Sequence, residues 1–196
     1  QLDYRINVAS ALLLSYFADT YKRYDKYELI DGKDMSYQND LLQPKIIFST
    51  TAWRDQTFTA GVEFLQESLY GDQFESGLLE RKAQWNTTAF VQDDWAISED
   101  LTLIGGARVD YHEKYGWNAS PKLSFLYRVF PFTTRLNYAR GFRSPSLKEL
   151  YMDWDHLGMF WIYGNENLKP ESNHYLSLSG EYVSSHLYAT LTAYGN

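Results

Sequence analysis

Apolar and polar residues alternate along most of the chain. In the segment 101–111, leucine, glycine, alanine, valine and tyrosine fill every second position, and Arg108 and Asp110 fall between them. Alternation of this kind predicts β-strands with one apolar face and one polar face. Continued through the other strand-like segments, it assigns to the apolar face Leu103, Val109, Leu123, Phe125, Leu176, Leu178 and Leu191. It assigns to the polar face Arg108, Asp110, Ser124, Ser177 and Thr190.

The pattern predicts an all-β fold, an antiparallel up-and-down meander of about nine strands with no helix of useful length. Several predicted strands exceed the five or six residues typical of soluble proteins and reach the roughly 9–11 residues that span a membrane. The predicted strands run near 5–26, 37–52, 57–70, 81–98, 101–115, 120–130, 132–142, 173–183 and 187–195.

The predicted connections alternate in length. Short ones fall at 53–56, 98–100, 130–131 and 184–186, and longer ones at 28–36, 71–80 and 143–172, with 116–118 as a short exception. In a meander, alternate connections lie at the same end of the sheet. Tight turns at one end and long loops at the other are typical of outer-membrane barrels.

The polar face also favours a membrane barrel. A soluble barrel of ordinary size keeps its apolar face inside, whereas a transmembrane barrel turns it toward lipid and encloses a polar lumen. Placing Arg108 and Asp110 in a dry core would be costly. Aromatic residues make up 17% of the chain, which suits the aromatic girdles of such barrels, although composition alone also suits a secreted soluble β-protein.

Charge and cysteine content exclude several functions. A net charge of -7 without any run of Lys and Arg argues against nucleic-acid binding. The absence of Cys removes disulfides, thiolate metal sites and cysteine nucleophiles. No segment has the roughly 18 apolar residues of a membrane helix, and no signal peptide opens the chain. Because a strand-like pattern starts almost at Gln1, we expect the chain to be cut from a longer protein.

Two motifs resemble those of TonB-dependent outer-membrane receptors. The segment 138–151, YARGFRSPSLKELY, resembles the "FRAP" box of that family through Phe142, Arg143, Ser144 and Pro145. The segment 163–171, YGNENLKPE, resembles its "NPNL" box through Asn165, Asn167 and Leu168. Ser144 stands where alanine is usual and Glu166 where proline is usual. The segments 90–95 and 105–111 are also similar to barrel strands of these receptors.

The resemblance implies a fold and a mechanism. Members have a 22-stranded barrel closed by an N-terminal plug, so residues 1–196 are expected to be part of the barrel domain, without the plug and the remaining strands. It implies a location in the bacterial outer membrane, contact with outer-membrane lipid, and uptake of an iron compound driven by TonB acting on the missing plug. It implies no enzymatic activity. An outer-membrane enzyme or adhesin is the alternative, but an enzyme should show a Ser/His/Asp-type constellation, and none can be assembled here.

His156 lies between the two boxes, as a histidine does in haem receptors that the chain resembles. Imidazole is an axial ligand of haem iron, so we expect haem as transported ligand, with His156 on the iron and no intrinsic cofactor. The other expected ligand-binding residues are Arg143, Trp154, Met159 and Phe160. A ferric siderophore or cobalamin is the alternative cargo, and an ordinary loop histidine is the alternative role.

Several residues receive structural rather than functional interpretations. Arg143 and Glu149 are expected to anchor the loop to the barrel wall, an interpretation slightly favoured over ligand binding. Pro145 and Pro170 are expected to end strand pairing on either side of the loop. Ordinary surface positions are expected for His112, His174 and His186, and a solvated loop face for Asp153 and Asp155.

Overall fold

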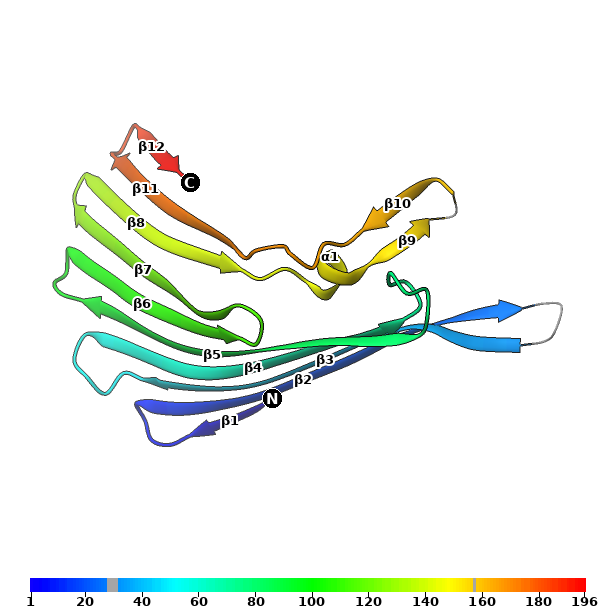
Figure 1. Cartoon of the computed structure of the whole chain (residues 1–196). Helices are drawn as coiled ribbons and strands as arrows, with labels where there is room; N and C mark the ends of the chain where they lie inside the picture. The colour runs from blue at the N-terminus through cyan, green and yellow to red at the C-terminus, as the bar shows by residue number, and fades with distance from the viewer. Residues whose placement is uncertain (28–31, 157) are drawn as a thin grey trace.

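A single curved sheet of ten antiparallel strands dominates the chain (Figure 1). The computed structural model describes residues 1–27, 32–156 and 158–196, with the side chains of Tyr27 and His156 outside that description. The sheet has the order β1-β2-β3-β4-β5-β6-β7-β8-β11-β12, so almost every strand pairs with its neighbours in sequence. The predicted all-β antiparallel meander is therefore confirmed.

The described residues form twelve strands and one short helix. The strands of the large sheet are β1 (Leu2–Arg5), β2 (Ser10–Tyr27), β3 (Gly32–Thr50), β4 (Gln56–Gly71), β5 (Glu80–Ala96), β6 (Leu101–His112), β7 (Gly116–Val129), β8 (Phe132–Arg143), β11 (Glu171–Val183) and β12 (Tyr188–Gly195). Between β8 and β11 lie α1 (Leu147–Tyr151) and a hairpin of β9 (Asp153–His156) and β10 (Phe160–Tyr163). No described helix is long and apolar enough to cross a membrane.

Strand register confirms the predicted division into two faces. In an antiparallel pair, directly opposed residues point to the same side. The pairs Thr88↔Asp110, Ser124↔Asn137, Asn137↔Ser177 and Glu181↔Thr190 carry one polar face across six strands. The pairs Leu103↔Phe125, Phe125↔Leu136, Leu136↔Leu178 and Leu178↔Ala193 carry the apolar face. Every residue assigned to a face from the sequence lies on that face.

The polar face is the concave one. The helix α1 packs on Tyr37 and Leu69, which register places on the same face as Glu63, and Figure 1 shows α1 inside the curve of the sheet. Buried charges on this face are paired, as desolvation requires. Lys45 Nζ lies 2.6 Å from Glu63, and Asp110 accepts hydrogen bonds from Thr88 (2.6 Å) and Arg108 (3.0 Å).

Two bands of aromatic residues bound the convex, apolar face. Near the long connections, Phe64, Trp85, Tyr111 and Trp117 form a continuous row with ring centroids 6.2, 5.7 and 4.9 Å apart. Near the tight turns lie Trp95 and the contacting pair Phe132–Tyr182. Trp95 is ten positions from Trp85 on the same strand, which is about 33 Å at roughly 3.3 Å per residue. A strand tilt of about 40° reduces this to about 25 Å, the height of the apolar band of an outer-membrane barrel.

The predicted first strand was wrong at its start. A strand from residue 5 was expected, but Arg5 ends β1, and a turn separates it from β2 at Ser10. The side chain of Asn7 accepts a hydrogen bond from the Ala9 amide at 2.9 Å, and the Ile6 amide donates to the Ser10 carbonyl at 2.9 Å. A local side-chain-to-backbone bond therefore closes a hairpin inside an apolar run. The predicted total of about nine strands is lower than the twelve observed in the described residues, because β1 was not separated from β2 and the β9–β10 hairpin was not predicted.

The connections follow the predicted alternation with two corrections. A loop was predicted at 28–36, but β3 already begins at Gly32, so residues 32–36 are strand. Residues 28–31 lie outside the described part of the chain. The link placed at 116–118 is a turn at 113–115, because Gly116, with φ of 69°, already starts β7. As predicted, β8 ends two residues before Pro145, and β11 starts immediately after Pro170.

An added charge should affect stability differently at neighbouring positions, because these positions lie on different faces of the sheet. In the complete protein in lipid vesicles, Leu123→Arg places a charge near the middle of the apolar face, where it should lower the free energy of unfolding by about 2–4 kcal/mol. Ser124→Arg, on the polar face, should change it by less than about 1 kcal/mol. Urea unfolding measures both. Equal destabilisation by the two variants would contradict the assignment of faces.

Candidate functional site

The loop between β8 and β11 begins with a capped helix. Ser146 Oγ accepts a hydrogen bond from the Glu149 amide at 3.3 Å, and the Glu149 carboxylate accepts one from the Ser146 amide at 2.8 Å. This reciprocal capping box satisfies amides that the first turn of a helix leaves without partners. A helix of only five residues is thereby fixed at its start.

Glu149 joins the two sequence boxes. Its carboxylate accepts a 2.6 Å hydrogen bond from Arg143, whose guanidinium also lies 3.4 Å from Glu171 at the start of β11. Its backbone carbonyl accepts a hydrogen bond from the Asn165 amide at 2.9 Å. The hydrogen bond from Arg143, followed by those from Ser146, lowers the pKa of Glu149 to about 2. The interpretation of Arg143 and Glu149 as the loop anchor agrees with this arrangement.

The second box folds as a turn that the β6–β7 turn holds in place. The Asn165 side chain accepts a hydrogen bond from the Asn167 amide at 2.9 Å, and the Leu168 amide donates to the Asn165 carbonyl at 3.1 Å. From the β6–β7 turn, Lys114 Nζ donates to the Glu166 carbonyl at 2.7 Å. Tyr115 donates its hydroxyl hydrogen to the Leu168 carbonyl at 3.1 Å.

Gly164 allows the two boxes to approach each other. A Cβ atom at this position would lie 2.8 Å from the Leu150 carbonyl carbon and 2.8 Å from the Tyr151 nitrogen. Both are backbone atoms, so a side chain could not be accommodated without moving α1. The Gly164 amide donates to the Met152 carbonyl. We call the assembly of Arg143, Ser146, Glu149, Gly164 and Asn165 the loop clamp.

The loop clamp sets α1 against the concave face of the sheet. Leu147 and Leu150 are 1% and 2% exposed, and Leu147 packs with Tyr37 of β3, Leu69 of β4 and Phe74 of the β4–β5 connection. This small cluster is the main buried apolar core of the described chain, because no other described element packs on the convex face of the sheet. A loop that leaves β8 thus reaches strands several positions away in the sheet.

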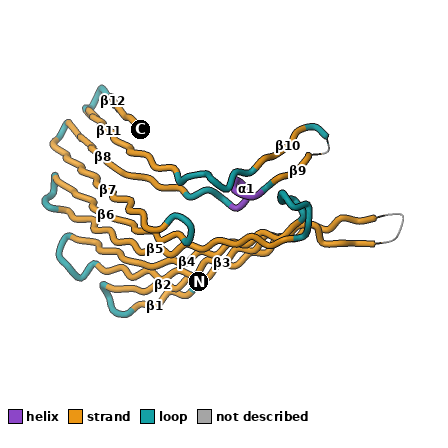
Figure 2. The backbone as a smooth tube through the Cα atoms, viewed as in Figure 1, coloured by secondary structure: helices purple, strands orange, loops and turns teal. Residues whose placement is uncertain are grey.

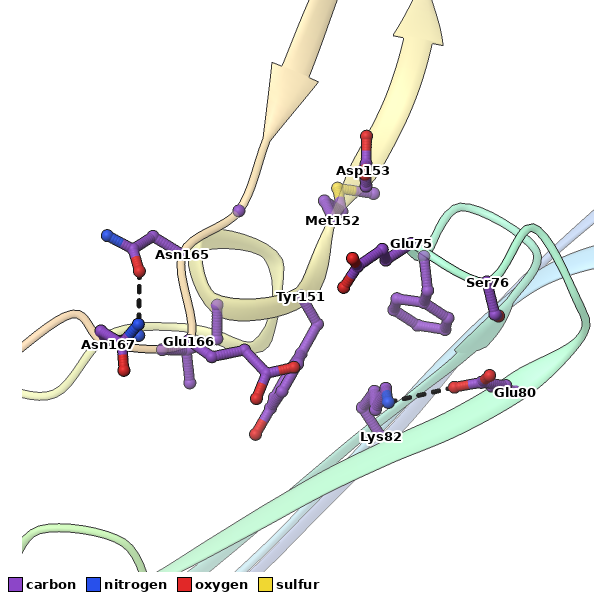
Figure 3. Close-up of a pocket in the computed structure, with 13 residues that line it drawn as sticks. Glu75, Ser76, Glu80, Lys82, Tyr151, Met152, Asp153, Asn165, Glu166 and Asn167 are labelled. Carbon is purple, nitrogen blue, oxygen red and sulfur yellow. Dashed lines mark hydrogen bonds and ion pairs between the residues drawn. The ribbon is translucent and has the colours of Figure 1, made fainter.

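Two cavities flank α1. The larger one, about 800 Å³, lies between the second box and the β4–β5 connection (Figure 3). Lys82 there forms a 3.0 Å ion pair with Glu80, and its Nζ lies 5.2 Å from the centre of the Tyr151 ring. The lining also includes several acidic and amide side chains, namely Glu75, Asp153, Glu166, Asn165 and Asn167.

The smaller cavity, about 440 Å³, lies on the side of β2 and β3. Two cations from different elements lie over the ring of Tyr37 within it. The guanidinium carbon of Arg23 and the Nζ of Lys148 are each 5.8 Å from the ring centre. The lining also includes Tyr21, Asn39, Leu41, Gln73, Met152, Trp154 and the carboxylates of Asp19 and Glu67.

The predicted ligand-binding residues are not gathered at one point. Trp154 lines the smaller cavity, whereas Arg143 lines neither cavity and belongs to the loop clamp. Met159 and Phe160 are exposed on the β9–β10 hairpin, beside a stack of Trp161 on Tyr163 with ring centres 5.8 Å apart. The side chain of His156 lies outside the described part of the chain, although its backbone pairs with Phe160.

Sequence reasoning missed the cations of the smaller cavity and the burial of one histidine. Arg23 and Lys148 stand in segments without a motif, so their convergence on Tyr37 has no sequence signal. His112, expected at the surface, is 2% exposed, and this prediction was wrong. Its ring packs on Tyr115 at 4.9 Å, and its Nδ1 accepts a hydrogen bond from the Lys114 amide at 3.2 Å, because the β6–β7 turn folds back over it.

The two aspartates of the β9–β10 hairpin have structural partners. Asp155 accepts a hydrogen bond from the Gly158 amide at 3.0 Å, and Asp153 accepts one from the Trp161 indole. Within residues 1–27, 32–156 and 158–196, no group of three or more His, Cys, Asp or Glu side chains is placed to hold a metal ion.

Comparison with known proteins defines the class of this fold. The model of the family described as TonB dependent receptor-like, beta-barrel, matches residues 1–196. The chain is 32% identical over 184 residues to the iron-regulated outer membrane virulence protein of Vibrio cholerae serotype O1, covering 91% of this chain and 28% of that protein. It is 24% identical over 170 residues to the probable TonB-dependent siderophore receptor PirA of Acinetobacter baumannii, covering 78% of this chain and 22% of that protein.

A solved structure shows the same fold. A mutant of the ferric enterobactin receptor PfeA of Pseudomonas aeruginosa superposes with a TM-score of 0.74 at 19% identity, covering 98% of this chain and 32% of that one. This chain therefore belongs to the TonB-dependent receptor-like β-barrel family, and its barrel lies in the outer membrane. It spans less than a third of the length of these relatives.

The lowered pKa of Glu149 predicts an acid-sensitive loop. A carboxylate whose pKa falls on folding stabilises the fold above its ordinary pKa of 4.5, and this contribution is lost as the pH falls toward about 2. Hydrogen exchange of the α1 amides, corrected for the intrinsic effect of pH, should therefore lose protection between pH 4.5 and about 2. Glu149→Gln should show low protection throughout, whereas Glu75→Gln, outside the loop clamp, should follow the parent. Protection that stays constant across this range would refute the role of Glu149.

Proposed function

We propose that this chain is part of a receptor that takes up a ferric siderophore across the outer membrane with energy delivered by TonB. Residues 1–196 form one part of its barrel domain, and a plug and further strands belong to the remainder of the protein. Family membership supports this proposal, as do relatives named as an iron-regulated outer membrane protein and a siderophore receptor. The name siderophore receptor describes binding rather than catalysis, which supports a role without enzymatic activity.

The smaller cavity is the observation that carries the choice of cargo. Ferric complexes of catecholate siderophores are anions with aromatic rings. Arg23 and Lys148 supply two positive charges at one ring, and Tyr21, Tyr37 and Trp154 supply flat surfaces for stacking. Two carboxylates, Asp19 and Glu67, line this cavity with the two cations, and Arg23 Nε also lies 3.8 Å from Asp25. Glu67 already accepts a hydrogen bond from Gln84 at 3.1 Å.

The larger cavity suits an anionic cargo less well, despite its volume. Among the described residues that line it, Lys82 is the only cation, and the ion pair with Glu80 neutralises it. Glu75, Asp153 and Glu166 add negative charge around the opening. Repulsion between these carboxylates and an anionic iron complex would lower affinity. We therefore assign binding to the smaller cavity and a supporting role to the larger one.

Loss of either cation should weaken binding of a ferric catecholate to the complete receptor. A cation–π contact contributes about 0.5–2 kcal/mol, and each 1.4 kcal/mol changes Kd tenfold, so Arg23→Ala and Lys148→Ala should each raise Kd about twofold to thirtyfold. Lys22→Ala is the matched control, because Lys22 neighbours Arg23 but faces the convex side by register. Fluorescence quenching by ferric enterobactin measures Kd. If all three variants bind like the parent, the smaller cavity is not the cargo site.

Haem is a second candidate cargo, and the β9–β10 hairpin is the observation that favours it. The hairpin presents Met159, Phe160, Trp161 and Tyr163, which are all at least half exposed. Aromatic surfaces of this kind can pack on a porphyrin, and His156, which pairs with Phe160 through the backbone, supplies an imidazole for the iron.

The haem proposal is tested at His156. In the complete receptor, His156→Ala should weaken haem binding and shift the visible absorption band of bound haem, because a methyl group cannot replace an imidazole–iron bond. A partial loss is expected, since the hairpin aromatics remain. His186→Ala is the control, because His186 lies in the tight turn between β11 and β12, at the other end of the sheet. Haem uptake by both variants at the parent rate would remove His156 as a ligand and leave the siderophore as the cargo.

A further inference from the structure

Three polar side chains form a cluster on the convex face near the extracellular ends of β8 and β11. His174 lies directly opposite Arg140 in the strand pairing, and Tyr138 lies diagonally beside it. The Tyr138 hydroxyl and His174 Nδ1 are 3.0 Å apart in a hydrogen bond, and the two rings stack at 6.1 Å. Register places all three on the face opposite to α1 and both cavities. They therefore cannot belong to the cargo site.

Arg140 lacks the partners that a guanidinium requires. Its Nε is buried and has no hydrogen-bond partner among the described residues. The residues that flank it on this face, Pro121, Phe142, Ser172 and Leu176, include no carboxylate within the part of the chain that the structure describes. A guanidinium nitrogen that is shielded from water without a hydrogen-bond partner is unfavourable. The five donors of a guanidinium, held in a fixed fork, match the oxygens of a phosphate.

The cluster lies at the depth of lipid headgroups. Arg140 is eight positions from Phe132, which lies on the same face at the tight-turn end of β8 and contacts Tyr182. Eight residues extend about 26 Å along a strand, or about 20 Å across the membrane at a tilt of about 40°. The apolar band is about 25 Å tall, so Arg140 lies near its outer edge, where long cationic side chains extend toward the headgroups.

We propose that Tyr138, Arg140 and His174 form a binding site for the phosphate group of a lipid headgroup in the outer leaflet of the membrane. Arg140 supplies the charge, and the Tyr138–His174 stack holds a second polar edge beside it. The convex face on either side is apolar and receives the acyl chains of the same lipid. The site thus anchors the barrel wall at the point where β8 leads into the loop clamp.

The test compares phosphorylated and dephosphorylated lipid A on the complete receptor, purified in detergent and stripped of lipid. The parent should bind bisphosphorylated lipid A about tenfold more tightly than the same lipid without phosphates. Arg140→Gln should remove this difference, whereas Arg140→Lys should keep part of it, because lysine retains the charge but not the fork. Lys122→Gln is the matched control, since it removes one cation from the concave face next to the same strand. Heat-modifiable electrophoretic mobility checks that each variant forms a barrel.

Two results would overturn the proposal. The first is a parent that does not distinguish the two lipids, or an Arg140→Gln variant with the parent's preference. The second is displacement of lipid A by inorganic phosphate at equal concentration, which would assign the cluster to a free anion instead of a lipid. Loss of the preference in Arg140→Gln alone, with Lys122→Gln unchanged and inorganic phosphate without effect, supports it.

Discussion

Backbone pairing between sequential strands is the constraint on which the rest of this structure depends. In the hydrocarbon region of a membrane, no water is present to satisfy an N–H or a C=O group, so each strand must bond to a neighbour. Pairing in register then fixes the face of every side chain, because successive residues point to opposite sides. The charged pairs around Glu63 and Asp110 and the aromatic bands of the convex face both follow from this one geometric rule.

The loop clamp shows how a short polar network controls a long connection. Glu149 accepts hydrogen bonds from Arg143 and Ser146 through its carboxylate and from Asn165 through its carbonyl. Both motifs therefore meet at one residue, and the helix between them is oriented so that Leu147 and Leu150 reach the sheet. The motif residues thereby place Lys148 over Tyr37 and Trp154 in the lining of the smaller cavity, which they do not line themselves.

The two faces of the sheet separate two kinds of recognition. The concave face carries paired charges, α1 and the two cavities that flank it. The convex face carries mainly apolar residues with aromatic borders, and Arg140, for which we propose a phosphate partner, is one of its few charged residues. Neighbouring residues of β8 serve the two sides, since Arg143 belongs to the loop clamp and Arg140 to the lipid face.

The sequence by itself determined the antiparallel meander, the assignment of residues to faces and the two motifs, because alternation and turn chemistry are local signals. It placed Leu103 and Arg108 on opposite faces correctly, since a period of two leaves no other arrangement. It missed the hairpin between β1 and β2, where a single Asn7 side chain overrides an apolar run. Only the tertiary structure brought Lys148 to the Arg23–Tyr37 pair of the β2–β3 hairpin, because this contact joins segments that are far apart in the chain. The burial of His112 also needed the structure, because it depends on how the β6–β7 turn folds back. No local sequence pattern predicts such contacts. They form when a loop, held in shape by its own hydrogen bonds, packs against strands from another part of the chain.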